Sequence, residues 1–327
     1  MSHEVKPGAA FETVSLHDPD ASLQATFVPG AGMLCCSLLH HGDELLAQNA
    51  GIETYAQSGK TMGIPLLYPW ANRLSGFDYS VTGRTVSVPH DPTCIALDQN
   101  GLPIHGVIGG RMAWEIVRAS RADAPSLLAR LIWSEERAEC FEVFPFHHDV
   151  HYEARLASGR LEIEIVVRAC GEDTVPVGFG FHPYLSLPGV ARERWLVELP
   201  AMRHLALDNR QIPVGAGQAS SARRFELAGN EFDDGFDSVD EPARFSVSAE
   251  QRHIELEFSK GYPCAQVYAP QSGQFICFEP MTAPTNALRS GAGLRLLAPS
   301  EEHRATFALT VIQAASQLRN SSDTGDV

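Results

Sequence analysis

The sequence predicts an all-β sandwich, and three observations support this fold class. Many segments alternate apolar and polar residues with a period of two, which is the pattern of half-buried antiparallel strands. The 27 glycines and 21 prolines fall mostly between these segments and mark turns. Helical periodicity is sparse: residues 52–57 (IETYAQ) predict a short helix, and no long amphipathic helix is expected. No repeat of fixed period indicates a propeller or a solenoid.

Three segments show the alternation over the greatest length. In LEIEIVV (161–167), apolar side chains occupy the odd-numbered positions, and Glu162 and Glu164 lie between them. Each segment is therefore expected to bury one face and expose the other. The same pattern recurs in HIELEFS (253–259) and RATFALTVIQ (304–313), and in the shorter RTVSVP (84–89), RWLVELP (194–200) and AQVYAP (265–270).

Length and charge limit the domain organisation and the partners. The chain of 327 residues contains no low-complexity linker, so residues 1–314 are expected to form one domain. Residues 315–327 are small, polar and acidic, which predicts a flexible tail. The net charge of −15 disfavours nucleic acid and anionic membranes as partners, and weighs against a highly phosphorylated substrate.

The cysteines and the N-terminal segment bear on the cellular compartment. Seven scattered cysteines without a C-x-x-C pair indicate neither a disulfide framework nor a zinc site. The first residues lack the apolar core of a signal peptide, and no run of eighteen apolar residues occurs. We therefore expect a cytoplasmic protein with reduced thiols.

The stretch GIPLLYPWANRLSG (63–76) places Asn72 and Arg73 at the end of an apolar segment. Its two prolines exclude a helix interior and a central strand. Two interpretations of Arg73 remain open on these residues alone. The guanidinium either binds backbone carbonyls to brace the loop, or is held rigidly over a polar ligand.

Two histidines lie in glycine-rich or aromatic surroundings. His105, in GLPIHGVIGG (101–110), has neighbouring glycines that allow close approach of a ligand, and the alternative is a histidine satisfied within a turn. The segment lacks the Lys-Ser/Thr ending of a phosphate loop. His182, in VGFGFHPYLSLP (177–188), ends a predicted strand among aromatic residues. This setting suits general acid or base chemistry, and the alternative is a core histidine bonded to a carbonyl.

Two acidic segments complete the set of candidate site residues. FDDGFD (232–237) contains Asp233 and Asp234, lacks the ligand spacing of an EF-hand loop, and fits either a solvated turn or a sugar-binding carboxylate. In FICFEPMTAPTNAL (275–288), Glu279 shares a strand face with Phe275, and Pro280 is expected to end the strand ladder. A carboxylate on an apolar face has a raised pKa or a partner, and both suit a general base.

A histidine-rich segment, FPFHHDVHYEARL (144–156), offers possible metal ligands. Val150, Tyr152 and Ala154 alternate as the buried face of a strand, which places His151 outside. We therefore expect no metal site there.

The order of these motifs resembles the aldose 1-epimerase (galactose mutarotase) family. The resemblance spans residues 63–288, and F-H-P-Y-L and F-E-P-M-T-A-P-T-N-A are its most specific parts. It implies a β-supersandwich, which is one large domain of antiparallel sheets with an open sugar-binding cleft. It also implies a small-molecule sugar as partner, no cofactor, and a monomer or homodimer.

The resemblance assigns roles to individual residues. Glu279 would be the base that removes the anomeric proton, and His182 the acid that protonates the ring oxygen. Arg73, His105 and Asp233 would hold the sugar, with Asn72 bracing the loop beside Arg73. The family's Asp-x-x-aromatic spacing selects Asp233, and Asp234 is the alternative. These roles suit a histidine pKa near its reference of about 6.5 and a glutamate pKa near about 4.3.

Two other functions fit the same motifs. Y-P-W-A-N-R resembles members that act on unphosphorylated aldoses, whereas a hexose-6-phosphate epimerase would need a basic patch near Arg73. Arg84, Arg111 and Arg289 are the candidates for that patch. A non-catalytic sugar-binding protein would not require both Glu279 and His182.

Overall fold

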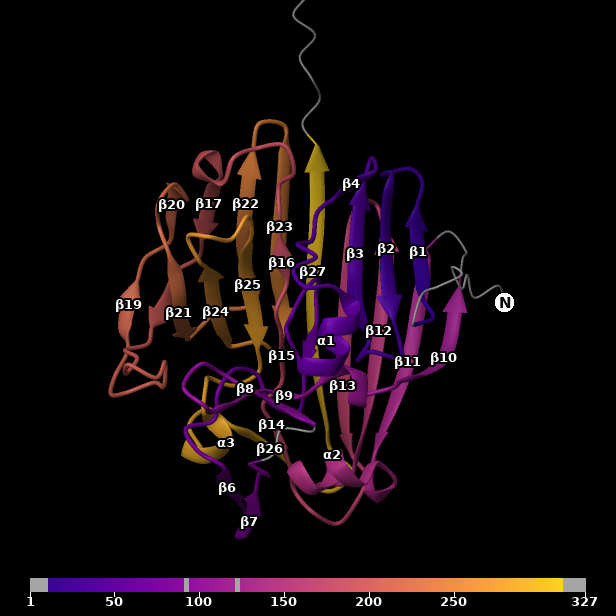
Figure 1. Ribbon diagram of the computed structural model, residues 1–327, viewed down its shortest axis with the longest axis vertical. Helices are drawn as coiled ribbons and strands as arrows, with labels where there is room; N and C mark the ends of the chain where they lie inside the picture. Colours follow the sequence, from indigo (N-terminus) through magenta and orange to yellow (C-terminus); the bar gives the residue numbers. More distant parts are fainter. Residues whose placement is uncertain (1–10, 91–93, 121–123, 314–327) are drawn as a thin grey trace, which may run out of the picture.

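The fold is built on one long antiparallel sheet that spans the width of the molecule (Figure 1). The computed structural model describes residues 11–90, 94–120 and 124–313. We call this nine-stranded sheet the long sheet. In spatial order it contains β10 (Glu115–Ser120), β11 (Ser126–Trp133), β12 (His148–Ala157), β13 (Arg160–Ala169), β27 (Glu302–Gln313), β23 (Arg252–Lys260), β22 (Ala243–Ala249), β17 (Leu196–Leu199) and β20 (Arg223–Glu226).

Two smaller sheets pack against the long sheet as a second layer. Backbone bridges from Cys35 to Ile64 and from Leu46 to Leu185 connect the two smaller sheets to each other. The four-stranded sheet runs β1 (Val14–Asp18), β2 (Leu23–Val28), β3 (Leu34–His40) and β4 (Asp43–Glu44). The eight-stranded sheet runs β19 (Gln218–Ser220), β18 (Met202–His204), β21 (Phe232–Asp237), β24 (Cys264–Ala269), β25 (Ile276–Met281), β15 (Gly180–Phe181) and β5 (Leu66–Leu67), and β16 (Tyr184–Leu185) also pairs with β25.

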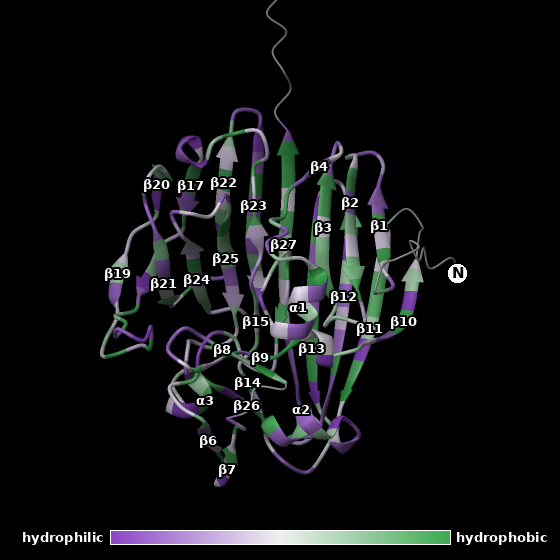
Figure 2. Cartoon of the chain, viewed as in Figure 1, coloured by the Kyte–Doolittle hydropathy of each residue, from purple (hydrophilic) through white to green (hydrophobic). Residues whose placement is uncertain are grey.

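The hydrophobic core lies between the two layers. Aromatic pairs connect them: Phe27 meets Tyr152 with ring centroids 6.2 Å apart, and Phe245 of the long sheet meets Phe278 of β25 at 5.5 Å. The predicted alternation is confirmed along β13, β23 and β27, where the apolar side chains at every second position are buried. Figure 2 shows this alternation of hydrophobic and hydrophilic residues along the strands. The predicted all-β sandwich is therefore correct.

Helices are short, as expected, and the predicted helix over IETYAQ is α1 (Ile52–Ser58). The others are α2 (Ala138–Val143), α3 (Ala287–Ser290) and the 3-10 turns Gly109–Arg111, Glu135–Arg137 and Arg192–Arg194. Two-stranded ribbons are formed by β6 (Asp78–Val81) with β7 (Arg84–Ser87), β8 (Ile95–Leu97) with β9 (Pro103–Val107), and β14 (Val175–Val177) with β26 (Arg295–Leu297). In the part of the chain that is described, no helix has the length and apolarity needed to cross a membrane.

The proline-containing stretch 63–76 is fixed to β9 by its backbone. Tyr68 bridges Gly106, Arg73 bridges Ile104, and the His105 N–H donates to the Asn72 carbonyl at 2.9 Å. Gly106 has φ +71°, and a Cβ there would lie 2.2 Å from the Tyr68 carbonyl oxygen, so only glycine fits. The two segments thus form one unit that carries Arg73 and His105 together.

One local expectation is wrong. Pro280 does not end the strand ladder, because β25 continues to Met281, which pairs with both Cys264 and Gly180. The ladder tolerates the absence of a backbone N–H at Pro280, which lies opposite Ala265. The assignment of residues 1–314 to one domain stays a prediction, and the predicted tail, 315–327, lies outside the described residues.

Candidate active site

The candidate residues gather on the face of the eight-stranded sheet that points away from the long sheet, here called the outer face. Phe278 packs on Phe245 of the long sheet, so its neighbour Glu279 must point the opposite way. Across the ladder, Glu279 lies opposite Gln266, and Gln266 lies opposite Gly235. Residues opposite one another share a face, so β21, β24 and β25 all contribute to the outer face.

Glu279 and His182 form a buried pair at the centre of this face. The His182 Nε2 lies 3.2 Å from the Glu279 Oε1, and the two residues are only 5% and 2% exposed. His182 follows β15, in which Phe181 packs on Phe307 of the long sheet, so the imidazole points to the outer face. The His105 ring meets the His182 ring edge to face, with centroids 5.6 Å apart.

Burial changes the protonation of this pair, and the expectation of near-reference pKa values is wrong. Desolvation lowers the pKa of His182 well below its ordinary value, and the neighbouring His105 lowers it further. Desolvation raises the pKa of Glu279 well above its ordinary value, and Asp233 raises it further while Arg73 opposes. Both groups are pushed towards their neutral forms, so the pair holds one proton across a wide range of pH.

Arg73 is held by three side chains. Its Nε donates to the Asp98 Oδ2 at 2.8 Å, its Nη1 donates to the Asn72 Oδ1 at 3.0 Å, and its Nη2 lies 3.7 Å from the Asp233 Oδ2. Asn286 fixes the same loop, because its N–H donates to the Arg73 carbonyl. The guanidinium is therefore both braced and directed towards the carboxylates of the outer face.

The structure separates the two adjacent aspartates. The FDDGFD segment is strand β21 rather than a turn, so Asp233 and Asp234 point to opposite faces. The Asp233 Oδ1 accepts from the Gln266 Nε2 at 2.6 Å on the outer face. Asp234 lies 2.8 Å from the His204 Nε2, away from Arg73. Only Asp233 of the two thus belongs with the Glu279 and His182 pair.

Several buried polar atoms of this cluster have no hydrogen-bond partner among the described residues. They are the Nδ1 atoms of His105 and His182, the Oε2 of Glu279 and the Oε1 of Gln266. Buried polar groups in native proteins are nearly always paired, so an unpaired set on one face is typical of a binding site. Burial also lowers the pKa of His105 to about 3, so it is neutral near pH 7 and suits hydroxyl groups better than anions.

The sequence did not single out Asp98 and Gln266 as site residues. Asp98 also accepts the N–H groups of Asn100 and Leu102, so locally it is an ordinary turn aspartate. Gln266 is one polar residue in the predicted strand 265–270. Their place beside Arg73 and Asp233 depends on pairings between distant segments, which no local pattern encodes.

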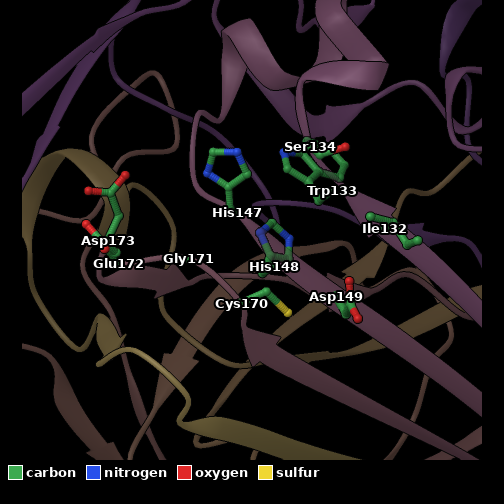
Figure 3. Close-up of a pocket in the computed structure, with 10 residues that line it drawn as sticks. All are labelled: Ile132, Trp133, Ser134, His147, His148, Asp149, Cys170, Gly171, Glu172 and Asp173. Carbon is green, nitrogen blue, oxygen red and sulfur yellow. The ribbon is translucent and has the colours of Figure 1, made fainter.

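The histidine-rich segment forms a separate recess of about 460 Å³ (Figure 3). His147 lies 2.8 Å from Glu135, Asp149 pairs with Arg130, and the buried His148 bonds to the Tyr68 hydroxyl. No group of three or more potential ligands is placed to hold a metal ion within residues 11–90, 94–120 and 124–313. The recess contains none of the outer-face residues described above.

The three arginines considered for a phosphate site are each paired with a carboxylate. Arg84 pairs with Asp173 at 3.0 Å, Arg289 with Asp78 at 3.1 Å, and Arg111 lies 3.9 Å from Glu139. These pairs are partly exposed and individually weak. Each of these guanidinium groups is nevertheless paired with a carboxylate that does not contact Arg73.

Several solved structures have the same fold as this chain. A galactose mutarotase-like protein from Clostridium acetobutylicum superposes with a TM-score of 0.80 at 16% identity, covering 93% of this chain and 96% of that one. Slr1438 from Synechocystis sp. PCC 6803 gives a TM-score of 0.75 at 22% identity, covering 96% and 100%. Galactose 1-epimerase from Lactobacillus acidophilus NCFM gives 0.70 at 16% identity, covering 96% and 98%. At these identities the likeness shows the fold alone.

Sequence comparison gives the family. The uncharacterized protein YihR of Escherichia coli (strain K12) is 26% identical over 307 residues, which cover 90% of this chain and 92% of that protein. The family model described as aldose 1-epimerase matches residues 12–310. Because this match takes in nearly all of the described strands, the chain belongs to the aldose 1-epimerase family.

Proposed function

We propose that this protein is an aldose 1-epimerase that interconverts the α and β anomers of an unphosphorylated aldose. The observation that carries the proposal is the buried pair of Glu279 and His182, 3.2 Å apart beside unpaired polar atoms. An acid and a base in contact are not needed for binding alone. They are needed to open and close a hemiacetal ring, which requires one proton to be removed and another delivered.

The proposed reaction starts with ionised Glu279 and protonated His182. Glu279 takes the proton from the anomeric hydroxyl, the bond from C1 to the ring oxygen breaks, and His182 protonates that oxygen. The product is the open-chain aldehyde, with both side chains neutral. After rotation about the C1 to C2 bond, the C5 hydroxyl returns its proton to His182 and attacks C1. The new anomeric oxygen then takes the proton from Glu279.

The shifted pKa values suit this cycle. Burial favours the neutral pair, which is the form present with the open-chain intermediate. The ionised pair, which starts the reaction, holds the same single proton, so passage between the two forms needs no exchange with solvent. The positive charge of Arg73 lowers the pKa of Glu279 and so stabilises its carboxylate form.

The remaining outer-face residues are proposed to hold the sugar. Arg73 and neutral His105 would donate to hydroxyl groups, and Asp233 would accept from them, with Asn72 fixing the guanidinium. Two carboxylates, Asp98 and Asp233, already surround Arg73, which disfavours a phosphate there. An unphosphorylated substrate therefore fits this arrangement better.

The first prediction concerns activity. Wild type should accelerate the change in optical rotation of at least one freshly dissolved α-aldose, and Glu279→Gln and His182→Asn should each lower that rate by at least about a hundredfold. Asp234→Asn is the matched control, because it removes a carboxylate from the opposite face and should retain most activity. Acceleration of 6-phosphates alone would support the phosphate-specific alternative. Sugar binding without acceleration would contradict catalysis.

The second prediction concerns Arg73. Arg73→Lys replaces a fixed fork of donors by one mobile charge, and should lower kcat/KM by about tenfold to a hundredfold. Arg289→Lys is the control, because Arg289 braces the same loop through Ser75 without contacting Asp98 or Asp233. It should lower only the thermal midpoint. If Arg73→Lys lost stability but kept kcat/KM, the proposed ligand role would be wrong.

The third prediction concerns the pH dependence of stability. The folded pKa of Glu279 exceeds the unfolded value of about 4.3, so above pH 4.3 the folded state binds more protons than the unfolded state. The free energy of unfolding therefore falls with rising pH until the folded pKa is passed. Glu279→Gln removes this loss, so its free energy of unfolding should rise relative to that of wild type between pH 4.5 and pH 8. Urea unfolding at both pH values measures the difference, and a constant difference would contradict the raised pKa.

A further inference from the structure

Tyr184 covers one face of the His182 imidazole. The two rings are stacked, with centroids 4.3 Å apart and an angle of 6° between their planes. Tyr184 is 5% exposed, and its phenol oxygen lies 3.4 Å from the His182 Nε2. Because the rings are nearly parallel, this separation runs between their planes. It is therefore a face-to-face contact rather than a linear hydrogen bond.

Thr61 fixes the hydroxyl of Tyr184. The Thr61 Oγ1 lies 2.5 Å from the Tyr184 hydroxyl, although the two residues are far apart in sequence. The Thr61 carbonyl in turn accepts from the Asn49 Nδ2 at 2.8 Å. Either oxygen can donate in this hydrogen bond, and in both cases it limits the movement of the Tyr184 ring relative to the imidazole.

Charged and titratable groups approach His182 from every element packed against it. Glu279 of β25 lies 3.2 Å from its Nε2, and the ionised form of this carboxyl group favours imidazolium. His105 of β9 and Arg73 both oppose a positive charge, as burial does. Tyr268 of β24 presents its ring edge to face at 5.7 Å, and Cys277 is its partner across the ladder. The stacked ring of Tyr184 adds a negative π face.

We propose that Tyr184 is a positioning residue that stabilises the imidazolium form of His182 through its ring face, and that Thr61 fixes Tyr184 in that position. The inference rests on the proposed function, in which protonated His182 is the acid. A cation over the face of an aromatic ring is stabilised by the ring quadrupole, more strongly where water is excluded. Both rings are buried here, so the contact offsets part of the desolvation that opposes protonation of His182.

The first test changes the ring's charge distribution while keeping its shape. Phenylalanine and pentafluorophenylalanine are placed at position 184, and the pKa of His182 is measured by NMR, with His182→Asn identifying its signal. The fluorinated ring reverses the quadrupole, so the pKa should be about half to one pH unit lower than with phenylalanine. kcat should be about threefold to tenfold lower. An equal pKa in the two variants would overturn the proposal.

The second test examines Thr61 by a double-mutant cycle. Thr61→Val and Tyr184→Phe each remove one partner of the same hydrogen bond, so the double variant should lose no more kcat than the larger single effect. Tyr262→Phe is the control, because Tyr262 is fully buried between the layers against Phe258 and Phe307. It should leave both kcat and the pKa of His182 unchanged. Additive effects in the cycle would contradict the role of Thr61.

The NMR titration needs no substrate, which separates this proposal from the proposed function. If no aldose is epimerised but the pKa of His182 follows the ring at position 184, the contact is real and the proposed activity is wrong. If epimerisation is observed but that pKa ignores the ring, Tyr184 has only a packing role.

Discussion

The exclusion of water from Glu279 and His182 is the constraint on which the rest of the structure depends. A carboxylate and an imidazole so far from solvent are stable only where the surrounding backbone holds them in contact. Here that support is the eight-stranded sheet, whose inner face is packed on the long sheet through pairs such as Phe278 with Phe245. The position of the pair is therefore set by the core beneath it, because Glu279 lies within β25 and His182 directly follows β15.

The same constraint explains the loop that carries Arg73. A single strand face cannot supply all the polar groups that a sugar would need, so further groups must come from another segment. The stretch 63–76 is rigid because its backbone is bridged to β9 at Gly106 and Ile104, and Asn286 binds its carbonyl. Asp98 and Asn72 then orient the guanidinium itself. Side chains rather than backbone carbonyls thus fix the Arg73 guanidinium, and its role as a sugar ligand stays a proposal.

The sequence predicts much of the fold and part of the site, and the limits have physical causes. Apolar and polar residues alternate in β13 and β27 because one face of each strand is buried, and this pattern can be recognised in the sequence alone. Glu279 could be placed on its strand face for the same reason. The contribution of Asp98 depends on pairing between distant segments, and the shifted pKa values depend on the depth of burial, so neither could be derived. Pro280 was expected to end its strand, but the neighbouring strands continue the ladder past it.

The central claim is that Glu279 and His182 act together on the reducing end of an aldose. A crystal structure of the Glu279→Gln variant, soaked with the aldose that wild type epimerises fastest, tests it most directly. We expect the anomeric oxygen within hydrogen-bonding distance of the side chain at position 279, and the ring oxygen within hydrogen-bonding distance of the His182 imidazole. Arg73 and Asp233 should contact other hydroxyl groups. A sugar bound with its reducing end away from this pair, or in the recess around His147, would contradict the account.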